Sequence, residues 1–445
     1  MRTKQSSAAG YMIVVAIVLG LGSISTFVFG RSYSELALQK EPFHRLSYVP
    51  SFDPIEDVTL GVQPNSGNFF APKLDASIRA IEIYPTQTIL YAGGKAIRSI
   101  NIHAPATLRK LDKVVANRRW ISAAGHTVTL DAAVVIEHGS SMTIAAPSTS
   151  ELIMSVRRGV FLAANRGHLH LSGVYVHASD TKVPTTFTLP GPVAGRPFIL
   201  AAEDSSMTIN NCVFRYLGRD WNSSYGLTWS KGSTGSVRNS LFEHDFIGVY
   251  SNDSTNLKVE HDRFYYDSLY GVDPHSGSSH LVIEYNTSDF NGRHGIIFSN
   301  HVTDGVVRHN VTRGNGLNGI MMDESSSHNT IEDNTATDNK SGGIVIANSS
   351  DDVVSANAIR NNRAGITVRG NSRDVTVAGN TVTGNQVASQ GTGLSGNNVY
   401  GNGGQWSERR IWAIWLGALG LLILLFAVTW LSKVRRGNHI LVPEH

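Results

Sequence analysis

The chain has 445 residues, of which 43 are glycine and 14 are proline, and its formal net charge is +3. Five cations and one anion in the two terminal tails account for that charge, so the remainder is close to neutral. A near-neutral body argues against a nucleic-acid partner, which calls for a basic face to offset phosphate charge. The single cysteine, Cys212, excludes an intrachain disulfide, so packing and hydrogen bonds must supply the stability.

An apolar run of 20 residues, 10–29, follows Arg2 and Lys4. It is long enough to cross a membrane as a helix. A signal peptide is the alternative, but the run is long for one and lacks a small-residue cleavage site, so an uncleaved anchor is favoured. We therefore assign residues 1–30 to a signal anchor or signal peptide and residues 31–74, which carry several prolines, to a linker and an N-terminal cap.

Short β-type runs begin after residue 75. They are rich in valine, isoleucine and threonine and alternate with glycine, asparagine and serine clusters, as strands separated by turns do. The runs are 78–84, 127–136, 141–145, 159–163 and 168–176. We interpret them as the first, less regular coils of a longer solenoid. Residues 181–196, with four prolines, are expected to form a loop that projects from one coil.

Glycines then recur at one phase of a repeat. The intervals are 23, 24, 24, 24 and 22 residues for the series Gly248, Gly271, Gly295, Gly319, Gly343 and Gly365. A period of this size with short β-type runs is typical of a solenoid, in which each repeat is one coil stacked on the next. Because the leucine-asparagine consensus of leucine-rich repeats is missing, we predict an all-β fold, a single-stranded parallel β-helix over residues 75–404.

Side-chain alternation predicts which residues of each coil point outward. The second and fourth positions, such as Val272 and Pro274, are mostly apolar and are expected inside. The third and fifth positions then lie outside: Asp273 and His275 in one coil, Tyr250 and Asn252 in the coil before, Ser299 in the coil after, and Asp323 one coil further. With coils about 4.8 Å apart, these residues predict a strip of polar and aromatic side chains.

Two asparagine columns support the same register. The first contains Asn286, Asn310, Asn334, Asn357 and Asn380, and the second contains Asn315, Asn339, Asn362 and Asn385. Stacked asparagines hydrogen-bond along such a column. We therefore interpret both columns as structural ladders at turns.

The chain ends with a second apolar run, 411–431, which has tryptophans near both ends. Aromatic rings at the ends of an apolar helix favour the membrane interface, so residues 405–432 are predicted to be a transmembrane helix. Lys433, Arg435 and Arg436 follow in the tail 433–445. The positive-inside rule places both tails in the cytoplasm, so the β-helix is expected on the periplasmic or extracellular side of a bacterial cytoplasmic membrane.

The string Tyr270-Gly271-Val272-Asp273-Pro274-His275 resembles the Tyr-Gly-Phe-Asp-Pro-His signature of the mannuronan C5-epimerases of alginate biosynthesis, which are right-handed parallel β-helices. The likeness extends to Gly195-Arg196-Pro197-Phe198, Leu217-Gly218, Tyr225-Gly226-Leu227 and Arg293-His294-Gly295-Ile296-Ile297, and so covers roughly residues 75 to 400. The resemblance implies that His275 and Tyr270 are the base and acid pair and that Asp273 matches the essential aspartate. Two positions differ: Ser276 replaces a second aspartate, and Asn300-His301 stands where an arginine is expected.

Inversion at C5 of a uronate removes a proton α to a carboxylate and returns one to the opposite face. The reaction needs a base, an acid across the ring, and a cation or hydrogen-bond donors that stabilise the charge on the carboxylate. Histidine suits the base because its ordinary pKa is about 6.5, and Asp273 is placed to orient the imidazole or raise its basicity. Strand parity alone would turn Tyr270 inward, so its role requires a bend at Gly271.

The neutralising cation is not identified by its position in the repeat. The candidates are His301, Arg293, Lys231 and Arg238, among which we favour His301, because parity past Ser299 keeps it outward. The remaining histidines, such as His168, His170 and His280, lack metal-ligand spacing, so neither a metal nor a cofactor is predicted.

The sequence therefore predicts a membrane-anchored, outward-facing C5-epimerase that acts on an anionic polysaccharide. Its expected partners are that polymer, the bilayer and a polysaccharide export or synthase complex. A polysaccharide lyase is one alternative, because it abstracts the same proton before β-elimination. A non-catalytic glycan-binding scaffold of an export complex is the other, and the two anchors and the missing arginine favour it.

Overall fold

The structure is a computed structural model of the chain. It describes residues 79–391, apart from 94, 157–159, 180–195 and 221–222, and the short strands 398–400 and 403–404. All of these residues belong to one compact unit. The predicted spans 10–29 and 411–431 lie outside the described residues. Among the described residues, no helix has the length and apolar character needed to cross a membrane.

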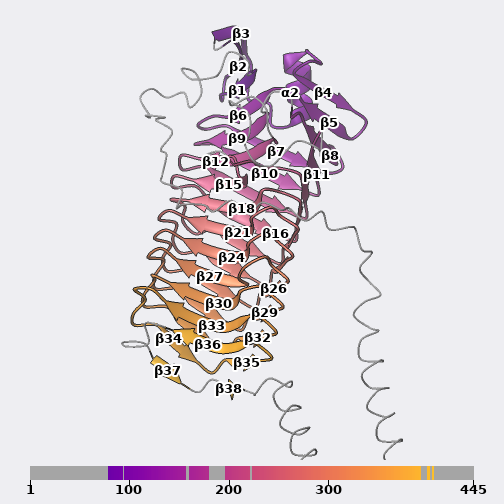
Figure 1. The fold of residues 1–445 in the computed structure, drawn as a ribbon. Coiled ribbons are helices and arrows are strands. Elements are labelled where there is room, and N and C mark those ends of the chain that lie inside the picture. The colour runs from indigo at the N-terminus through magenta and orange to yellow at the C-terminus, as the bar shows by residue number, and fades with distance from the viewer. Residues whose placement is uncertain are drawn as a thin grey trace, which may run out of the picture. The chain divides into compact units, whose positions relative to one another are not determined.

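Three sheets, here called A, B and C, form the described part, with coils stacked in chain order (Figure 1). Sheet A has 14 strands, in the order β3 (Lys95–Asn101), β2 (Gln87–Ala92), β1 (Ala80–Ile83), β6 (Ala133–Ile136), β9 (Phe161–Asn165), β12 (Phe198–Ala202), β15 (Gly226–Ser230), β18 (Ile247–Asn252), β21 (Tyr270–His275), β24 (His294–Ser299), β27 (Ile320–Asp323), β30 (Gly342–Ala347), β33 (Ala364–Arg369) and β36 (Val387–Gly391).

Sheets B and C complete each coil. Sheet B has 13 strands: β4 (Ile121–Ala124), β5 (Thr127–Leu130), β8 (Glu151–Met154), β11 (Tyr175–Ala178), β14 (Val213–Arg215), β17 (Leu241–Glu243), β20 (Arg263–Tyr265), β23 (Thr287–Asp289), β26 (Val311–Arg313), β29 (Thr335–Thr337), β32 (Ala358–Arg360), β35 (Thr381–Thr383) and β38 (Gly403–Gly404). Sheet C has 11 strands: β7 (Ser141–Ala145), β10 (His168–Ser172), β13 (Ser206–Asn210), β16 (Thr234–Arg238), β19 (Lys258–Glu260), β22 (Val282–Glu284), β25 (Val306–Arg308), β28 (Thr330–Glu332), β31 (Val353–Ser355), β34 (Thr376–Ala378) and β37 (Asn398–Tyr400).

Each regular coil passes through sheets A, C and B in turn, as in β18, β19 and β20 before β21. Strands of successive coils pair in parallel, for example Val249 with Val272 and Val259 with Ile283. The predicted all-β parallel β-helix is therefore confirmed.

The first coils differ from this regular path. Strands β1, β2 and β3 pair antiparallel, as do β4 and β5. The helix α2 (Leu108–Val115) starts after Thr107, whose hydroxyl accepts a hydrogen bond from the Lys110 amide, and buries Leu108, Leu111 and Val115. These antiparallel pairs and the helix were not predicted from the sequence.

The glycine column marks the corner where each coil enters sheet A. A Cβ on Gly271 would lie 2.8 Å from the Gly295 carbonyl oxygen, and a Cβ on Gly295 would lie 2.8 Å from that of Gly319. Only hydrogen fits at such distances. The glycine period thus follows from the close approach of each coil to the next.

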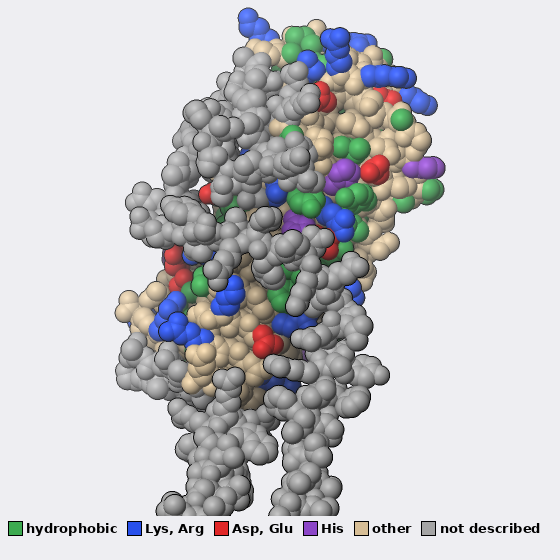
Figure 2. Space-filling model, turned by 45° about the vertical axis from the view of Figure 1, so that its right-hand side comes forward, with side chains coloured by type: hydrophobic (Ala, Val, Ile, Leu, Met, Phe, Trp, Pro, Cys, Tyr) green, Lys and Arg blue, Asp and Glu red, His purple; other side chains and the backbone are tan. Residues whose placement is uncertain are grey.

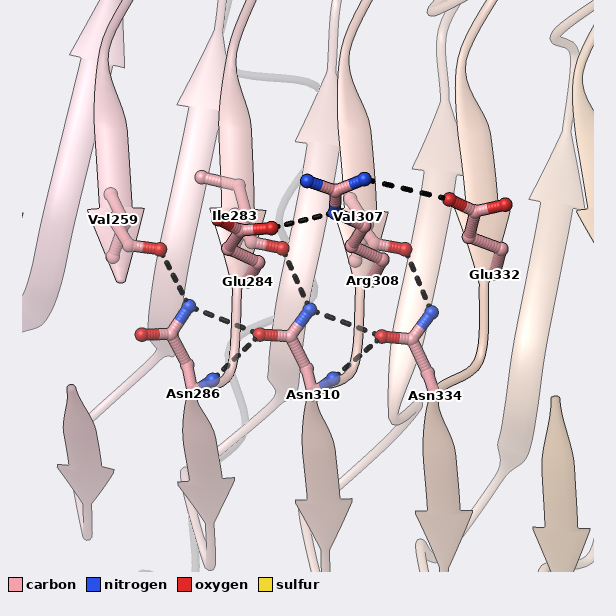
Figure 3. A network of polar contacts seen from close by, with 9 residues as sticks. All are labelled: Val259, Ile283, Glu284, Asn286, Val307, Arg308, Asn310, Glu332 and Asn334. Atoms are coloured by element: carbon pink, nitrogen blue, oxygen red, sulfur yellow. Dashed lines mark hydrogen bonds and ion pairs between the residues drawn. The ribbon is translucent and has the colours of Figure 1, made fainter. Parts of the chain in front are cut away.

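The asparagine columns form ladders, as predicted. In the first, the Asn286 amide nitrogens Nδ2 and N donate to Asn310 Oδ1, and Asn310 repeats both contacts with Asn334 (Figure 3). Nδ2 of Asn286 also donates to the Val259 carbonyl at 2.8 Å. Each asparagine side chain therefore forms hydrogen bonds with buried backbone groups of the preceding coil.

The coil interior is a continuous apolar core. As side-chain alternation predicts, this core includes residues of sheet A that are 0% exposed: Val272, Ile296, Phe298, Ile320 and Met322. Phe214, Phe242 and Phe264 from sheet B stack inside, with ring centroids 5.0 and 4.7 Å apart. This packing holds the strands of sheet A in register and so fixes the side chains on its outer face.

Candidate active site

Several of the predicted site residues share the outer face of sheet A. Tyr250 pairs with Asp273 in the register of β18 and β21, and Asn252 pairs with His275. His275 pairs with Ser299 in β24, which pairs with Asp323 in β27. Two columns result: Tyr250 and Asp273 in one, and the residues from Asn252 to Asp323 in the other.

Tyr270 lies on this same face because the alternation is reset at Gly271. A Cβ on Gly271 would meet Ser288 Oγ and Phe264 Cβ, which belong to the coil interior, and Val272 also faces the interior. Two consecutive inward positions leave Tyr270 outward, where it packs beside the cluster of Ile297, Met321, Val345 and Ala347 and beside Tyr250. The predicted bend at Gly271 is therefore present.

The Tyr270 phenol is enclosed by one cation and one aromatic ring. Arg293 Nη1 donates to its oxygen at 3.3 Å, and the His294 ring stacks on the Tyr270 ring with centroids 5.4 Å apart. Burial, together with the nearby Asp273 carboxylate, raises the pKa of Tyr270 to about 12, against the opposing effect of Arg293. Burial lowers the pKa of His294 to about 3, so this imidazole is neutral and serves as a packing surface.

Asp273 is a buried carboxyl group. It is 3% exposed, and its Oδ1 has no hydrogen-bond partner among the described residues. Burial, followed by the charge of Glu324, raises the pKa of Asp273 well above its ordinary value. No hydrogen bond joins it to His275 in the described part of the chain, so the expected orienting contact is not observed.

His275 is half-buried at the end of β21 and is oriented by a different residue. Its Nδ1 lies 2.5 Å from Ser276 Oγ, and Asn300 Nδ2 donates to the same Oγ at 3.1 Å. The His275 ring is 5.8 Å from that of Tyr250, which in turn is 4.5 Å from that of Tyr225. Imidazole and phenols therefore line one continuous stretch of the outer face.

The outer face is less polar than the sequence analysis expected. Ile297, Met321 and Val345 occupy the third positions of the coils after Asp273 and are 4 to 5% exposed. Asp323 is half-buried, accepts a hydrogen bond from the Glu324 amide at 2.9 Å, and has a pKa raised by burial. Polar side chains thus follow one column, from Asn252 to Asp323, whereas the neighbouring column becomes apolar after Asp273.

Two curated relatives match part of this chain in sequence. The mannuronan C5-epimerase of Pseudomonas aeruginosa is 30% identical over 179 residues, which are 37% of this chain and 32% of that protein. The mannuronan C5-epimerase AlgG of Azotobacter vinelandii is 28% identical over 177 residues, 37% of this chain and 33% of that protein. The resemblance to the mannuronan C5-epimerases is confirmed. The chain matches about a third of the length of these curated relatives.

Two further comparisons concern fold and metal binding. A crystal structure of the periplasmic alginate epimerase AlgG has a similar fold, with a TM-score of 0.63 at 19% identity over 72% of this chain and 85% of that one. A family model described as "Periplasmic copper-binding protein (NosD)" matches residues 203–408. No group of three or more His, Cys, Asp or Glu side chains is placed to hold a metal ion within the part of the chain that the structure describes.

The two departures from the epimerase signature contact each other. Ser276 stands in place of the second aspartate and Asn300 stands where an arginine is expected, and the Asn300 side chain holds the Ser276 hydroxyl that contacts His275. Ser276 and Asn300 have positive φ angles of 40° and 63°, and each lies directly after the end of its strand, β21 and β24 respectively. The separation of 24 residues is one repeat and places the two positions in adjacent coils, but the contact was not predicted because the two residues differ in type.

The structure separates the four candidate cations. β24 ends at Ser299, and His301 has a φ of 64° and is exposed, so strand parity does not extend to it. Lys231 and Arg238 form ion pairs with Glu203 at 2.9 Å and Glu260 at 2.5 Å. Of the four, Arg293 is the one that contacts a predicted catalytic side chain.

Charge over the described surface is mixed. Figure 2 shows basic and acidic side chains interspersed on the uncovered part of one face. This distribution agrees with the near-neutral composition. An anionic ligand would therefore depend on individual cations rather than on a broad basic surface.

Proposed function

We propose that the chain is a polyuronate C5-epimerase that converts mannuronate to guluronate within a polymer. In this proposal the segments 10–29 and 411–431 anchor it in a bacterial cytoplasmic membrane, with the solenoid on the outward side and a polysaccharide export or synthase complex as partner. The observation that supports it most is the shared outer face of Tyr270, Asp273 and His275, with Arg293 on the Tyr270 phenol at 3.3 Å.

His275 is the proposed base. Its Nδ1 contacts Ser276, so Nε2 is the nitrogen that would take the C5 proton. The neighbouring Asn300 fixes the Ser276 hydroxyl and thereby the plane of the imidazole. Fixing the ring before the substrate binds reduces the entropy cost of reaching the transition state.

Tyr270 is the proposed acid. It lies near the opposite end of β21 from His275, so a sugar ring placed between them would meet the base on one face and the phenol on the other. A pKa of about 12 keeps the phenol protonated at neutral pH, as a proton donor must be. The C5 proton moves to His275, the Tyr270 proton moves to C5 on the opposite face, and solvent then returns the imidazole proton to the phenolate.

Arg293 and Asp273 are the proposed stabilisers of the substrate carboxylate. As the C5 proton leaves, negative charge develops on the carboxylate oxygens, and a guanidinium or other donor placed beforehand stabilises it. A buried Asp273 with a raised pKa favours its protonated form, which donates a hydrogen bond instead of repelling the charge. Asn252, Ser299 and Asp323 would contact the hydroxyls of neighbouring sugars.

The proposal is tested by incubating the full-length chain with polymannuronate and following guluronate by proton nuclear magnetic resonance. The wild type should form guluronate, and His275→Ala should lower the rate at least about a hundredfold, as loss of a catalytic base does. His280→Ala is the matched control, because His280 is an exposed histidine at a turn.

The products distinguish the alternatives. New unsaturated chain ends that absorb ultraviolet light would identify a lyase. Binding of the polymer without any conversion would identify a glycan-binding scaffold. Equal activity of His275→Ala and wild type would refute the assigned base.

A further inference from the structure

Arg219 lies in the loop between β14 and β15, and hydrogen bonds fix the backbone around it. Its amide donates to the Ser224 carbonyl at 2.9 Å, and the Gly218 amide donates to the Pro197 carbonyl at 2.8 Å. Gly218 has a φ of +81°, and a Cβ there would lie 2.1 Å from the Tyr225 carbonyl oxygen. This backbone directs Arg219 toward sheet A, where its guanidinium lies 5.6 Å from the centre of the Phe198 ring.

The Arg219 guanidinium is buried and has no counter-ion among the residues that the structure describes. The residue is 5% exposed, and its Nε and Nη1 have no hydrogen-bond partner among the described residues. Burial alone lowers the pKa of Arg219 to about 10, and the adjacent Asp220 forms no ion pair with it. A buried charge without a partner is unfavourable, and a bound anion would offset that cost.

Neighbouring arginines do have partners. Arg215 pairs with Glu243, Arg238 pairs with Glu260, and Arg313 pairs with Asp289. Arg196, which is also buried, donates to the His244 carbonyl at 2.6 Å. Arg219 therefore differs from these cations by lacking an acceptor within the described structure.

A second buried donor lies between Arg219 and the candidate active site. Leu200, Thr228, Tyr250 and Asp273 are in direct register on the outer face of sheet A. Thr228 is 0% exposed, and its Oγ1 has no hydrogen-bond partner in the described part of the chain. Phe198, under the Arg219 guanidinium, belongs to the same strand and face as Leu200.

The distance along this line matches an extended sugar chain. The strand that carries Phe198 is three strands from the one that carries Asp273, or about 14 Å at the usual strand spacing. One pyranose ring of an extended chain is about as long as one strand spacing. A chain that lies along the solenoid axis with one sugar at His275 would bring another carboxylate to Arg219.

We propose that Arg219 and Thr228 form a binding subsite for a polyuronate, in which the Arg219 guanidinium holds the carboxylate of a sugar about three residues from the reacting one. The subsite rests on the proposed function for the identity of the polymer. It also sets the direction of the chain, which runs from the reacting sugar at β21 toward β12.

Binding of mannuronate oligomers of increasing length tests the subsite. The full-length chain carries His275→Ala in every sample, so that no conversion occurs, and titration calorimetry gives Kd for the dimer through the octamer. Affinity should rise once an oligomer is long enough to reach Arg219, and Arg219→Met should remove about 10- to 100-fold of that rise. Thr228→Val should remove a smaller part, and Arg238→Met is the matched control because its guanidinium is held by Glu260.

A neutral mannose oligomer of equal length separates the carboxylate from the sugar ring, and it should show no effect of Arg219→Met. Thermal unfolding provides a second readout: without ligand, Arg219→Met should unfold at the same or a higher temperature, because an unpaired buried charge is removed. Length-dependent affinity that Arg219→Met leaves unchanged would overturn the subsite. If Arg219→Met lowers the affinity but the chain with His275 intact converts no polymannuronate in the separate epimerase assay, the epimerase assignment is overturned and the subsite stands.

Discussion

Asp262 occupies a position in the first ladder that asparagine fills in the following coils, and replacing it tests the cost of that carboxyl. Its Oδ1 accepts a hydrogen bond from the Ser240 amide at 2.7 Å, while Oδ2 has no hydrogen-bond partner among the described residues. Asn286, one coil later, uses the equivalent Nδ2 to donate to the Val259 carbonyl. Val237 pairs with Val259, so Asp262→Asn would place Nδ2 near the Val237 carbonyl.

Burial raises the pKa of Asp262 from 3.8 to about 8, although hydrogen bonds from the backbone oppose the shift. The folded chain therefore keeps a proton that the unfolded chain releases above about pH 4, so the folded state loses stability as the pH rises from about 4 to about 8. Each pH unit in this window corresponds to about 1.4 kcal/mol, which gives about 3 kcal/mol between pH 5 and pH 7.

The assay is urea denaturation of the full-length chain, followed by circular dichroism at pH 5 and pH 7. Asp262→Asn should be more stable than the wild type at both pH values, and its advantage should grow by about 3 kcal/mol between them. Asp304→Asn, at an exposed aspartate, serves as the control and should show no such growth. An advantage of Asp262→Asn that stays the same at both pH values would refute the protonated, buried state of this carboxyl.

Three further substitutions test the site and the coil geometry. Asp273→Asn, which keeps a hydrogen-bond donor, should retain epimerase activity within about tenfold, whereas Asp273→Ala should lower kcat about a hundredfold or more. An equal loss of activity in both variants would show that the ionised carboxylate is required. Arg293→Met should lower kcat about a hundredfold and move the alkaline limb of the pH-rate profile upward, because Arg293 lowers the pKa of Tyr270; an unchanged profile would exclude this role. Gly271→Ala should lower the free energy of unfolding by at least about 1 to 3 kcal/mol, because its Cβ would meet Ser288 Oγ at 2.1 Å. Gly125 has open space around it, so Gly125→Ala should lower the free energy of unfolding by about 1 kcal/mol or less, as measured by urea denaturation.

The repeating part of the fold was predictable because like residues stack on like residues. Asn310 donates to Asn334 and accepts from Asn286, so a column of asparagines in the sequence implies a column in space. The glycine column follows from the close approach of Gly271 to the Gly295 carbonyl. Both patterns recur with each coil and are visible without any knowledge of tertiary structure.

The first coils and the cations of the site were not predictable in the same way. The antiparallel pairing of β1 with β2 and the helix α2 occur once and leave no period in the sequence. His301 was favoured by strand parity, but parity ends where the chain adopts a φ of 63° at Asn300. Lys231 could not be recognised as the partner of Glu203, because the two residues are 28 positions apart.

We use a departure from the repeat to propose a functional residue only together with the face of the coil on which the departure lies. Asp262 and Asp267 interrupt the asparagine ladders, yet they accept hydrogen bonds from the amides of Ser240 and Asp245 and so still serve the buried turns. Asp273 also interrupts a column that is otherwise apolar in the following coils, but it faces outward from sheet A beside Tyr250 and has no hydrogen-bond partner for Oδ1 among the described residues. A carboxyl that completes a ladder stabilises the coil, whereas an unsatisfied carboxyl on the outer face remains available to a ligand. The same criterion selects Arg219 and Thr228, which no repeat in the sequence indicates.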